Sequence, residues 1–348
     1  MTRSLFWLTR IGLAALPLAA CAQSGSTALG DPRFAPPSVE AACNTLTMAS
    51  TGGPVAKDAK TLVVRWLGFS TFELIYGDKI ILLDNYYDRG PRYRDLGFHA
   101  ADVKRADLIL VGHAHHDHMS DTAQVAKQTG APVVAAPITI AKLRSQGVPD
   151  KQLVEVAGKS GDLLSYAGFK VEPVLGRHGE PPKVMAEFAK AYTDSIAKPT
   201  AAETAAEEAI RDRGSRDEHI IDEGEISFIV TFDSGFRLAW RDSGGEMTTY
   251  EKAAMQRYGR TDVLLGAIAA SGPSEVQAKL YVPMLTTYQP DVVFPAHHEE
   301  EVGRNIDRAT EPLFQYGKAA LPGAIFVSKL YREPTCFDTR RNVASNTR

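Results

Sequence analysis

Residues 111–118 read Val111-Gly-His113-Ala-His115-His116-Asp117-His118, and they hold four of the nine histidines of the chain. The residues just before the first histidine, 107–111, are almost wholly apolar, which is typical of a strand buried on both faces of a sheet. In α/β folds, ligands gather at the carboxyl ends of such strands. Imidazole nitrogen together with carboxylate oxygen suits borderline cations such as Zn²⁺. The stretch therefore predicts a metal site at a strand end, rather than a solvated histidine-rich loop.

The composition sets the class of protein around this motif. The chain has 348 residues, of which 44% are hydrophobic and 23% charged, as in ordinary globular proteins with a sizeable core. That length allows two domains of average size or one large domain. Lysine and arginine total 39 against 42 aspartate and glutamate, a net charge of -3 without basic runs. This charge argues against a nucleic-acid-binding protein, which would usually show a basic surface.

Apolar runs on both sides of the motif predict alternating strands and helices. Strands are expected at residues 61–66, 69–76, 79–83, 107–111, 132–135, 153–156, 162–166, 169–175, 226–232, 236–240, 262–265 and 292–294, and helices near 121–129, 137–146, 246–257 and 275–288. A polar, Ala- and Glu-rich stretch at about 179–224 interrupts this order and is predicted to be a helical insertion. The order favours two similar halves that make one large domain of α/β layers over residues 61–348.

The first 20 residues are predicted to be a secretory signal. Arg3 and Arg10 precede an apolar run that ends before Cys21 and is too short to span a bilayer, which takes about 20 apolar residues. The run ends in Leu-Ala-Ala-Cys, which resembles a bacterial lipobox, so we expect a lipoprotein of the outer membrane or periplasm that is anchored by lipidated Cys21. The alternative is ordinary cleavage after Ala22, which would give a soluble periplasmic or secreted protein.

Residues 21–60 are rich in Ser, Thr, Gly, Pro and Ala and are predicted to be a flexible tether. Beyond Cys21 the chain contains Cys43 and Cys336. Two cysteines in an oxidising compartment favour a disulfide between the N-terminal arm and the C-terminal end. Two unpaired thiols are the alternative, because a sequence does not show proximity. Neither cysteine has the spacing of a metal ligand.

The pattern H-x-H-x-D-H resembles the metallo-β-lactamase fold superfamily. Trp66-Leu-Gly-Phe-Ser-Thr-Phe72 and Ile80-Ile-Leu-Leu-Asp84 look like the opening strands of its broad hydrolase branch, and the resemblance covers approximately residues 61–300. It implies an α/β fold in which two similar halves form an αββα sandwich with a metal site at one edge. It also implies three further ligands, each just beyond a later strand: His178, Asp242 and His297.

The resemblance divides the ligands between two divalent cations, with zinc preferred and manganese or iron as alternatives. The expected ligands are His113, His115 and His178 for one cation and Asp117, His118 and His297 for the other, with Asp242 as the bridge. His298 competes with His297, which is closer to the strand end. The motif's variable position, His116, is expected beside the site or at the surface, and no motif supports His99 or His219.

Two departures from the family pattern bear on the substrate. Arg241 stands where the family commonly has Gly before the bridging aspartate, and Arg177 precedes His178. Two guanidinium groups beside ligand positions could hold a phosphate or a carboxylate, so both are candidate substrate-binding residues. Alternatively, both point outward and pair with acidic residues of the insertion. The insertion itself is either a wall or lid of the substrate pocket or a peripheral helical excursion.

A di-metal centre lowers the pKa of bound water to about 7, so the expected nucleophile is a metal-bound hydroxide that the catalytic residue Asp117 orients. We therefore expect a metal-dependent hydrolase at the cell envelope that acts on an anionic ester or phosphodiester, either a small molecule or lipid-like. A lactonase or β-lactamase with the same site is the alternative among enzymes. A non-catalytic metal-binding lipoprotein is the alternative outside them. The sequence leaves the oligomeric state open.

Overall fold

The computed structural model describes residues 40–179, 187, 190, 197–217, 219–268, 274–298 and 306–340. The predicted signal, the predicted lipidation site Cys21 and the predicted tether up to residue 39 lie outside the described residues. Within the part of the chain that is described, no helix combines the length and the apolar character that crossing a membrane requires.

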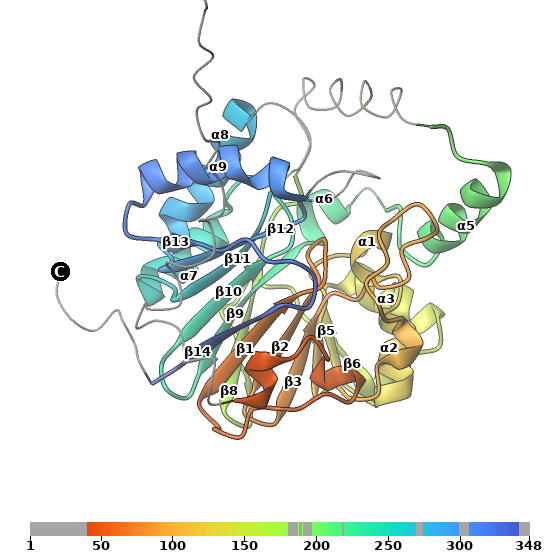
Figure 1. The fold of residues 1–348 in the computed structure, drawn as a ribbon, viewed down its shortest axis with the longest axis horizontal. Helices are drawn as coiled ribbons and strands as arrows, with labels where there is room; N and C mark the ends of the chain where they lie inside the picture. The colour runs from red at the N-terminus through yellow and green to blue at the C-terminus, as the bar shows by residue number, and fades with distance from the viewer. Residues whose placement is uncertain are drawn as a thin grey trace, which may run out of the picture.

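Two seven-stranded sheets form the centre of the molecule (Figure 1). Their strands are β1 (Thr61–Trp66), β2 (Phe72–Tyr76), β3 (Lys79–Leu83), β4 (Leu108–Leu110), β5 (Val133–Ala135), β6 (Leu153–Glu155), β7 (Leu164–Tyr166), β8 (Phe169–Leu175), β9 (Ile226–Phe232), β10 (Arg237–Arg241), β11 (Val263–Ala267), β12 (Val292–Ala296), β13 (Ile325–Phe326) and β14 (Pro334–Asp338). The first sheet has the order β14-β1-β2-β3-β4-β5-β6 and the second β13-β12-β11-β10-β9-β8-β7. Each half of the chain thus builds one sheet, except that β14 returns to the first.

Helices cover the outer face of each sheet. Their bounds are α1 (His116–Met119), α2 (Thr122–Thr129), α3 (Pro137–Ser145), α5 (Ala201–Arg211), α6 (Ile220–Glu223), α7 (Thr249–Tyr258), α8 (Ser274–Tyr288) and α9 (Ile306–Ala320), with short 3-10 turns η2 (Ala41–Asn44), η3 (Ala49–Thr51), η4 (Ala100–Asp102) and η5 (Asp150–Gln152). In Figure 1, α2 and α3 lie beside β5 and β6, whereas α7, α8 and α9 lie on the side of β11, β12 and β13. The αββα sandwich that the family resemblance implied is confirmed.

The alternation of side chains along β1 shows why both faces of the sheet must be packed against other elements. Leu62 and Val64 pack between the two sheets, whereas Val63 joins the apolar cluster on the outer side of the first sheet. In β9, Phe228 faces the other sheet and Ile229 faces α7, α8 and α9. Successive side chains of a strand point to opposite faces, so a strand that is apolar on both faces is stable only when both are covered.

The expected strands all form, but two features differ from the prediction. β2 begins at Phe72 instead of residue 69, because Phe69 has a φ of 46° and belongs to the turn after β1. The sequence also predicts no helix or strand after residue 294, whereas the structure has α9, β13 and β14 there.

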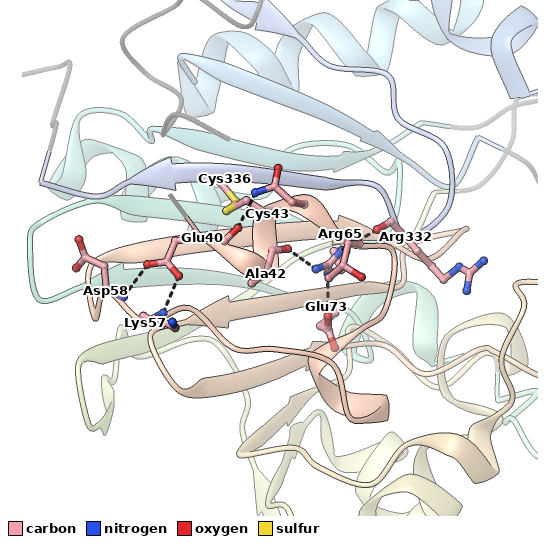
Figure 2. Close-up of a disulfide and its surroundings, with 11 residues drawn as sticks. Glu40, Ala42, Cys43, Lys57, Asp58, Arg65, Glu73, Arg332 and Cys336 are labelled. Carbon is pink, nitrogen blue, oxygen red and sulfur yellow. Dashed lines mark hydrogen bonds and ion pairs between the residues drawn. A yellow bond between two sulfur atoms is a disulfide. The ribbon is translucent and has the colours of Figure 1, made fainter. Parts of the chain in front are cut away.

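The tether prediction for residues 21–60 is wrong for residues 40–60. In this part, Ala42, Met48 and Ala49 are buried against the outer side of the first sheet. Cys43 forms a disulfide with Cys336 of β14, with their Cα atoms 6.0 Å apart, so the favoured pairing of these cysteines is confirmed (Figure 2). Residues 40–60 are therefore part of the folded structure.

A buried ion pair explains why the arm packs there. Arg65 of β1 and Glu73 of β2 are opposite one another on adjacent strands, and the Arg65 Nε lies 3.2 Å from the Glu73 Oε2 (Figure 2). The Arg65 guanidinium donates to the carbonyl oxygens of Ala42 and Thr45, and Glu73 accepts from the backbone N–H of Ser50 at 2.8 Å. Buried charges need such partners, and the arm supplies them.

Candidate metal centre

The predicted ligands lie at the carboxyl ends of four strands. The histidine loop follows β4, His178 follows β8, Asp242 follows β10 directly, and His297 follows β12. β8, β10 and β12 run in the same direction in the second sheet, and β4 belongs to the first. The site therefore needs both sheets.

The first triad consists of His113, His115 and His178. The His113 Nε2 lies 2.9 Å from the His115 Nδ1. The His178 ring stands edge-on to both, with centroids 4.7 Å from His113 and 4.6 Å from His115. One ligand atom from each residue lies within 4.8 Å of the others, a separation that a single cation can bridge.

The second triad consists of Asp117, His118 and His297. The His297 Nε2 lies 3.2 Å from the Asp117 Oδ2 and 3.1 Å from the His118 Nε2. The ligand atoms of this triad also lie within 4.8 Å of one another. His297 reaches them from a left-handed backbone conformation, with a φ of 57°. Such a conformation is costly for a residue other than glycine, and strained residues of this kind cluster at active and ligand-binding sites.

Asp242 lies between the two triads. Its Oδ2 is 2.6 Å from the His113 Nδ1 and 3.3 Å from the His118 Nδ1, whereas its Oδ1 is buried with no hydrogen-bond partner. This approach depends on Gly112, because a Cβ there would lie 1.8 Å from the Asp242 Oδ2. The glycine just before the first histidine is therefore required by the carboxylate of a distant strand.

Asp84, which follows β3, is a site residue that the sequence analysis did not assign. Its Oδ2 lies 2.6 Å from the His118 Nδ1, and its Oδ1 accepts from the backbone N–H of Gly112 at 3.0 Å. The side chain is fully buried, and the φ of 52° is left-handed. The available signal was an aspartate directly after a buried strand that pairs with β4 in parallel. The carboxyl ends of parallel neighbours meet at one edge of the sheet.

Burial and mutual repulsion set the protonation of this cluster. Burial, followed by the neighbouring histidines, lowers the pKa of His113 and His118 well below the usual value, and it lowers the pKa of His178 to about 4. Burial opposes ionisation of Asp117, but His118 and His297 hold the pKa of its carboxyl well below the usual range. The imidazoles of His113, His118 and His178 are thus neutral and the Asp117 carboxylate is ionised at neutral pH, as cation binding requires.

The substrate-binding role expected for Arg241 is wrong. Its side chain is fully buried, and its Nε lies 2.8 Å from the Glu251 Oε1 on α7. The two terminal nitrogens donate to the carbonyl oxygens of Ser243 at 2.6 Å and Glu246 at 3.1 Å. Trp240 packs between the sheets, so the side chain of the next residue, Arg241, points to the outer face of its sheet, where α7 covers it.

Arg177 and the other histidines lie outside the two triads. The side chain of Arg177 is 47% exposed, and its Nη2 is 3.4 Å from the Asp222 Oδ1 on α6, as expected for a pair with the insertion. The His298 ring stacks on Trp66 with centroids 4.3 Å apart, so His297 is the residue that faces the second triad. His116 is partly buried beside the site, and His99 and His219 are exposed.

Comparison with known proteins agrees with this geometry. A family model described as the beta-lactamase superfamily domain matches residues 80–298. A protein of Agrobacterium fabrum named metal-dependent hydrolase is 36% identical over 110 residues, which are 30% of this chain and 43% of that protein. This chain spans less than half the length of the curated relatives that it matches.

Two solved structures resemble the whole sandwich. The metallo hydrolase Igni18 of Ignicoccus hospitalis is 16% identical, with a TM-score of 0.54 over 80% of this chain and 98% of that one. The β-hydroxylase CmlA of Streptomyces venezuelae is 15% identical, with a TM-score of 0.51 over 79% of this chain and 53% of that one. At such low identity these likenesses show the fold alone.

Proposed function

The chain belongs to the beta-lactamase superfamily, and from this premise we propose that it is a metal-dependent hydrolase whose centre holds two divalent cations. The observation that carries the proposal is the pair of triads with Asp242 between them. The first triad would hold one cation and the second triad the other. Asp242, which lies between the triads and has one oxygen without a partner, would be a ligand that the two cations share.

The arrangement of the nitrogen and oxygen atoms suits bound cations better than it suits hydrogen bonds among these side chains. Nitrogen faces nitrogen at 2.9 Å between His113 and His115 and at 3.1 Å between His118 and His297. The Nδ1 atoms of His113 and His118 lie against carboxylates and take the single proton of each neutral ring, so both Nε2 atoms keep a lone pair that can bind a cation. The buried carboxylate oxygen of Asp242 that has no partner is costly unless a ligand binds it. Because imidazole nitrogen dominates the set, zinc is our first choice, with manganese and iron as alternatives.

Each carboxylate has its own task in this proposal. Cations bound here would supply Lewis acidity and lower the pKa of a bound water. Asp117 would be the catalytic residue, because its side chain belongs to the second triad and is 19% exposed, so it would both hold a cation and orient the attacking water. Asp84 and Asp242 are fully buried and orient His118 and His113 through their Nδ1 atoms.

For the substrate we propose an anionic ester or phosphodiester. Cations held by the two triads would supply Lewis acidity toward a negatively charged group, so the site suits an anionic substrate. Arg177 directly precedes the ligand His178, and its exposed pair with Asp222 contributes little stability, so it stays a candidate for binding the substrate anion. The likeness to CmlA lies in the fold alone and carries no argument for oxygen chemistry.

We further propose that the protein acts at the bacterial cell envelope, anchored by lipidated Cys21. The apolar run before Cys21 supports export. The disulfide between Cys43 and Cys336 supports it independently, since such bonds persist in oxidising compartments. Expression of the full chain with a Cys21→Ser variant tests the anchor. We expect the wild-type protein in the membrane fraction and the variant in the soluble fraction. The same distribution of both proteins between the fractions would contradict the anchor.

One assay distinguishes the possible functions. The full chain is purified, the cations per chain are counted, and hydrolysis of bis(p-nitrophenyl) phosphate, a lactone and a β-lactam is followed with and without chelator. Chelator-sensitive hydrolysis of the diester supports the proposal. Hydrolysis of the lactone or the β-lactam alone would assign the other enzyme class. Two bound cations without any turnover would overturn the catalytic proposal and leave a metal-binding lipoprotein.

A further inference from the structure

An aromatic cluster borders the second triad. Phe69 lies in the turn after β1, and Tyr86 and Tyr93 lie in the loop that follows Asp84 and β3. The Phe69 ring packs against Tyr86 and Tyr93, with centroids 5.1 and 5.9 Å apart, and stands edge-on to His297 at 5.4 Å. These contacts place the loop of residues 85–93 beside His297.

Helix α5 of the insertion holds this loop in place. Ile210 packs into the cluster with Phe69 and Tyr86. The Arg92 Nε lies 2.8 Å from the Glu207 Oε1, and both side chains are less than one-fifth exposed. Partial burial makes this pair less sensitive to salt than an exposed one. The loop and α5 therefore form one unit.

The turn after α5 docks on the histidine loop itself. The backbone N–H of Ser215 donates to the Ala114 carbonyl at 2.7 Å. A Cβ at Gly214 would lie 2.4 Å from the backbone nitrogen of His116, so the two backbones are in close contact. Figure 1 shows α5 on the same side of the sandwich as α1. Of the two roles considered for the insertion, a wall of the site or a peripheral excursion, these contacts favour the wall.

This unit presents one hydroxyl that the protein leaves available. Among the described residues, the Tyr93 hydroxyl has no hydrogen-bond partner, although the ring is partly buried. The neighbouring Tyr86 hydroxyl, by contrast, donates to the Arg89 carbonyl. Burial, followed by the charge of Asp117, raises the pKa of Tyr93 to about 12. The phenol is thus protonated at neutral pH, lies within the field of a ligand carboxylate and can act as a donor.

We propose that Tyr93 is a substrate-contacting residue, whose hydroxyl donates a hydrogen bond to an oxygen of the phosphate or carboxylate group bound at the two triads. This role rests on the proposed function, because the cations would bring that oxygen to the centre. Tyr93 then supplies the polar contact that was expected of Arg241. It comes from the wall that α5 holds, so the insertion takes part in substrate selection.

Phosphate binding to the zinc-loaded full chain tests this role. Tyr93→Phe keeps the ring and its packing, and Tyr250→Phe on the exposed part of α7 is the matched control. We expect Tyr93→Phe to weaken the binding of inorganic phosphate, measured by calorimetry, about tenfold, the loss typical of a hydrogen bond to a charged group. The zinc content should be unchanged, and Tyr250→Phe should bind as wild type does.

Two other results would overturn the role for different reasons. If wild type and Tyr93→Phe bind phosphate equally at full zinc content, Tyr93 does not contact the anion, while the proposed function stands. If wild type takes up no cation, or takes up zinc and binds no phosphate, the proposed function fails and this role fails with it. Diester hydrolysis provides a second measurement. We expect kcat/KM to fall about tenfold in Tyr93→Phe and to stay unchanged in Tyr250→Phe.

Discussion

The Nδ1 of His118 lies 2.6 Å from the Oδ2 of Asp84, and both side chains are buried from solvent. A carboxylate at this distance makes Nδ1 the protonated nitrogen of the imidazole. The Nε2 then keeps its lone pair and points toward His297. One hydrogen bond thus fixes both the tautomer and the direction of a ligand.

Replacing Asp84 by asparagine should weaken cation binding without unfolding the protein. The amide keeps the shape but removes the charge that favours the required tautomer of His118. Loss of such a partner typically costs about 10–100-fold in metal affinity. Competition with a chromogenic chelator measures the change. Asp88→Asn, at a position farther along the same loop, is the control, and equal affinity in both variants would contradict the orienting role of Asp84.

Removing one ligand should remove one cation. His115 contributes to the first triad alone, so His115→Ala should retain about one cation per chain and lose most diester hydrolysis. Elemental analysis of the purified variant measures the content. His219→Ala, at an exposed position, should keep both cations and full activity. Full cation content and turnover in His115→Ala would remove His115 from the ligand set.

Opening the disulfide should destabilise the fold. Cys43 and Cys336 are 293 residues apart, so their link restricts the unfolded chain strongly. The paired substitution of both cysteines by alanine should lower the free energy of unfolding by about 3–5 kcal/mol. Urea unfolding followed by circular dichroism gives the value. The same midpoint for wild type with and without reductant would show that the link contributes nothing.

Asp262 should make stability depend on pH. Burial is the main cause that raises the pKa of its carboxyl to about 6, while its Oδ2 accepts from the backbone N–H of Arg237 at 2.7 Å. A pKa raised in the folded state means that the folded protein binds the proton more tightly. The contribution of this group to stability therefore falls as the pH rises from about 4 through 6.

Asp262→Asn keeps the acceptor and removes the charge. At pH 8 it should raise the free energy of unfolding by about 1–3 kcal/mol, and near pH 4.5 it should have little effect. Urea titrations at the two pH values measure the difference. A gain that is equal at both pH values, or a loss at pH 8, would contradict the assigned ionisation.

Local patterns in the sequence predicted strands β1 to β12 and the histidine loop, but not the edge strands β13 and β14. The distant residues His178, Asp242 and His297 could be ordered after their strands only with the help of the family resemblance. The direction of Arg241 was missed because its partner Glu251 lies on a helix packed across the sheet. The folded arm was not predicted because Ser, Gly and Pro also occur in ordered turns. In addition, the arm is held by hydrogen bonds from Arg65 to its backbone carbonyl oxygens, and Arg65 is remote in sequence from these acceptors.

If the two triads hold two cations that hydrolysis requires, the activity must follow the cation content. The most direct measurement is the cation content of the purified full chain, set against its rate of bis(p-nitrophenyl) phosphate hydrolysis as chelator removes the cations and zinc restores them. We expect two cations per chain, and a rate that falls and recovers with their content. A chain that binds no cation, or a rate that is independent of the content, would contradict it.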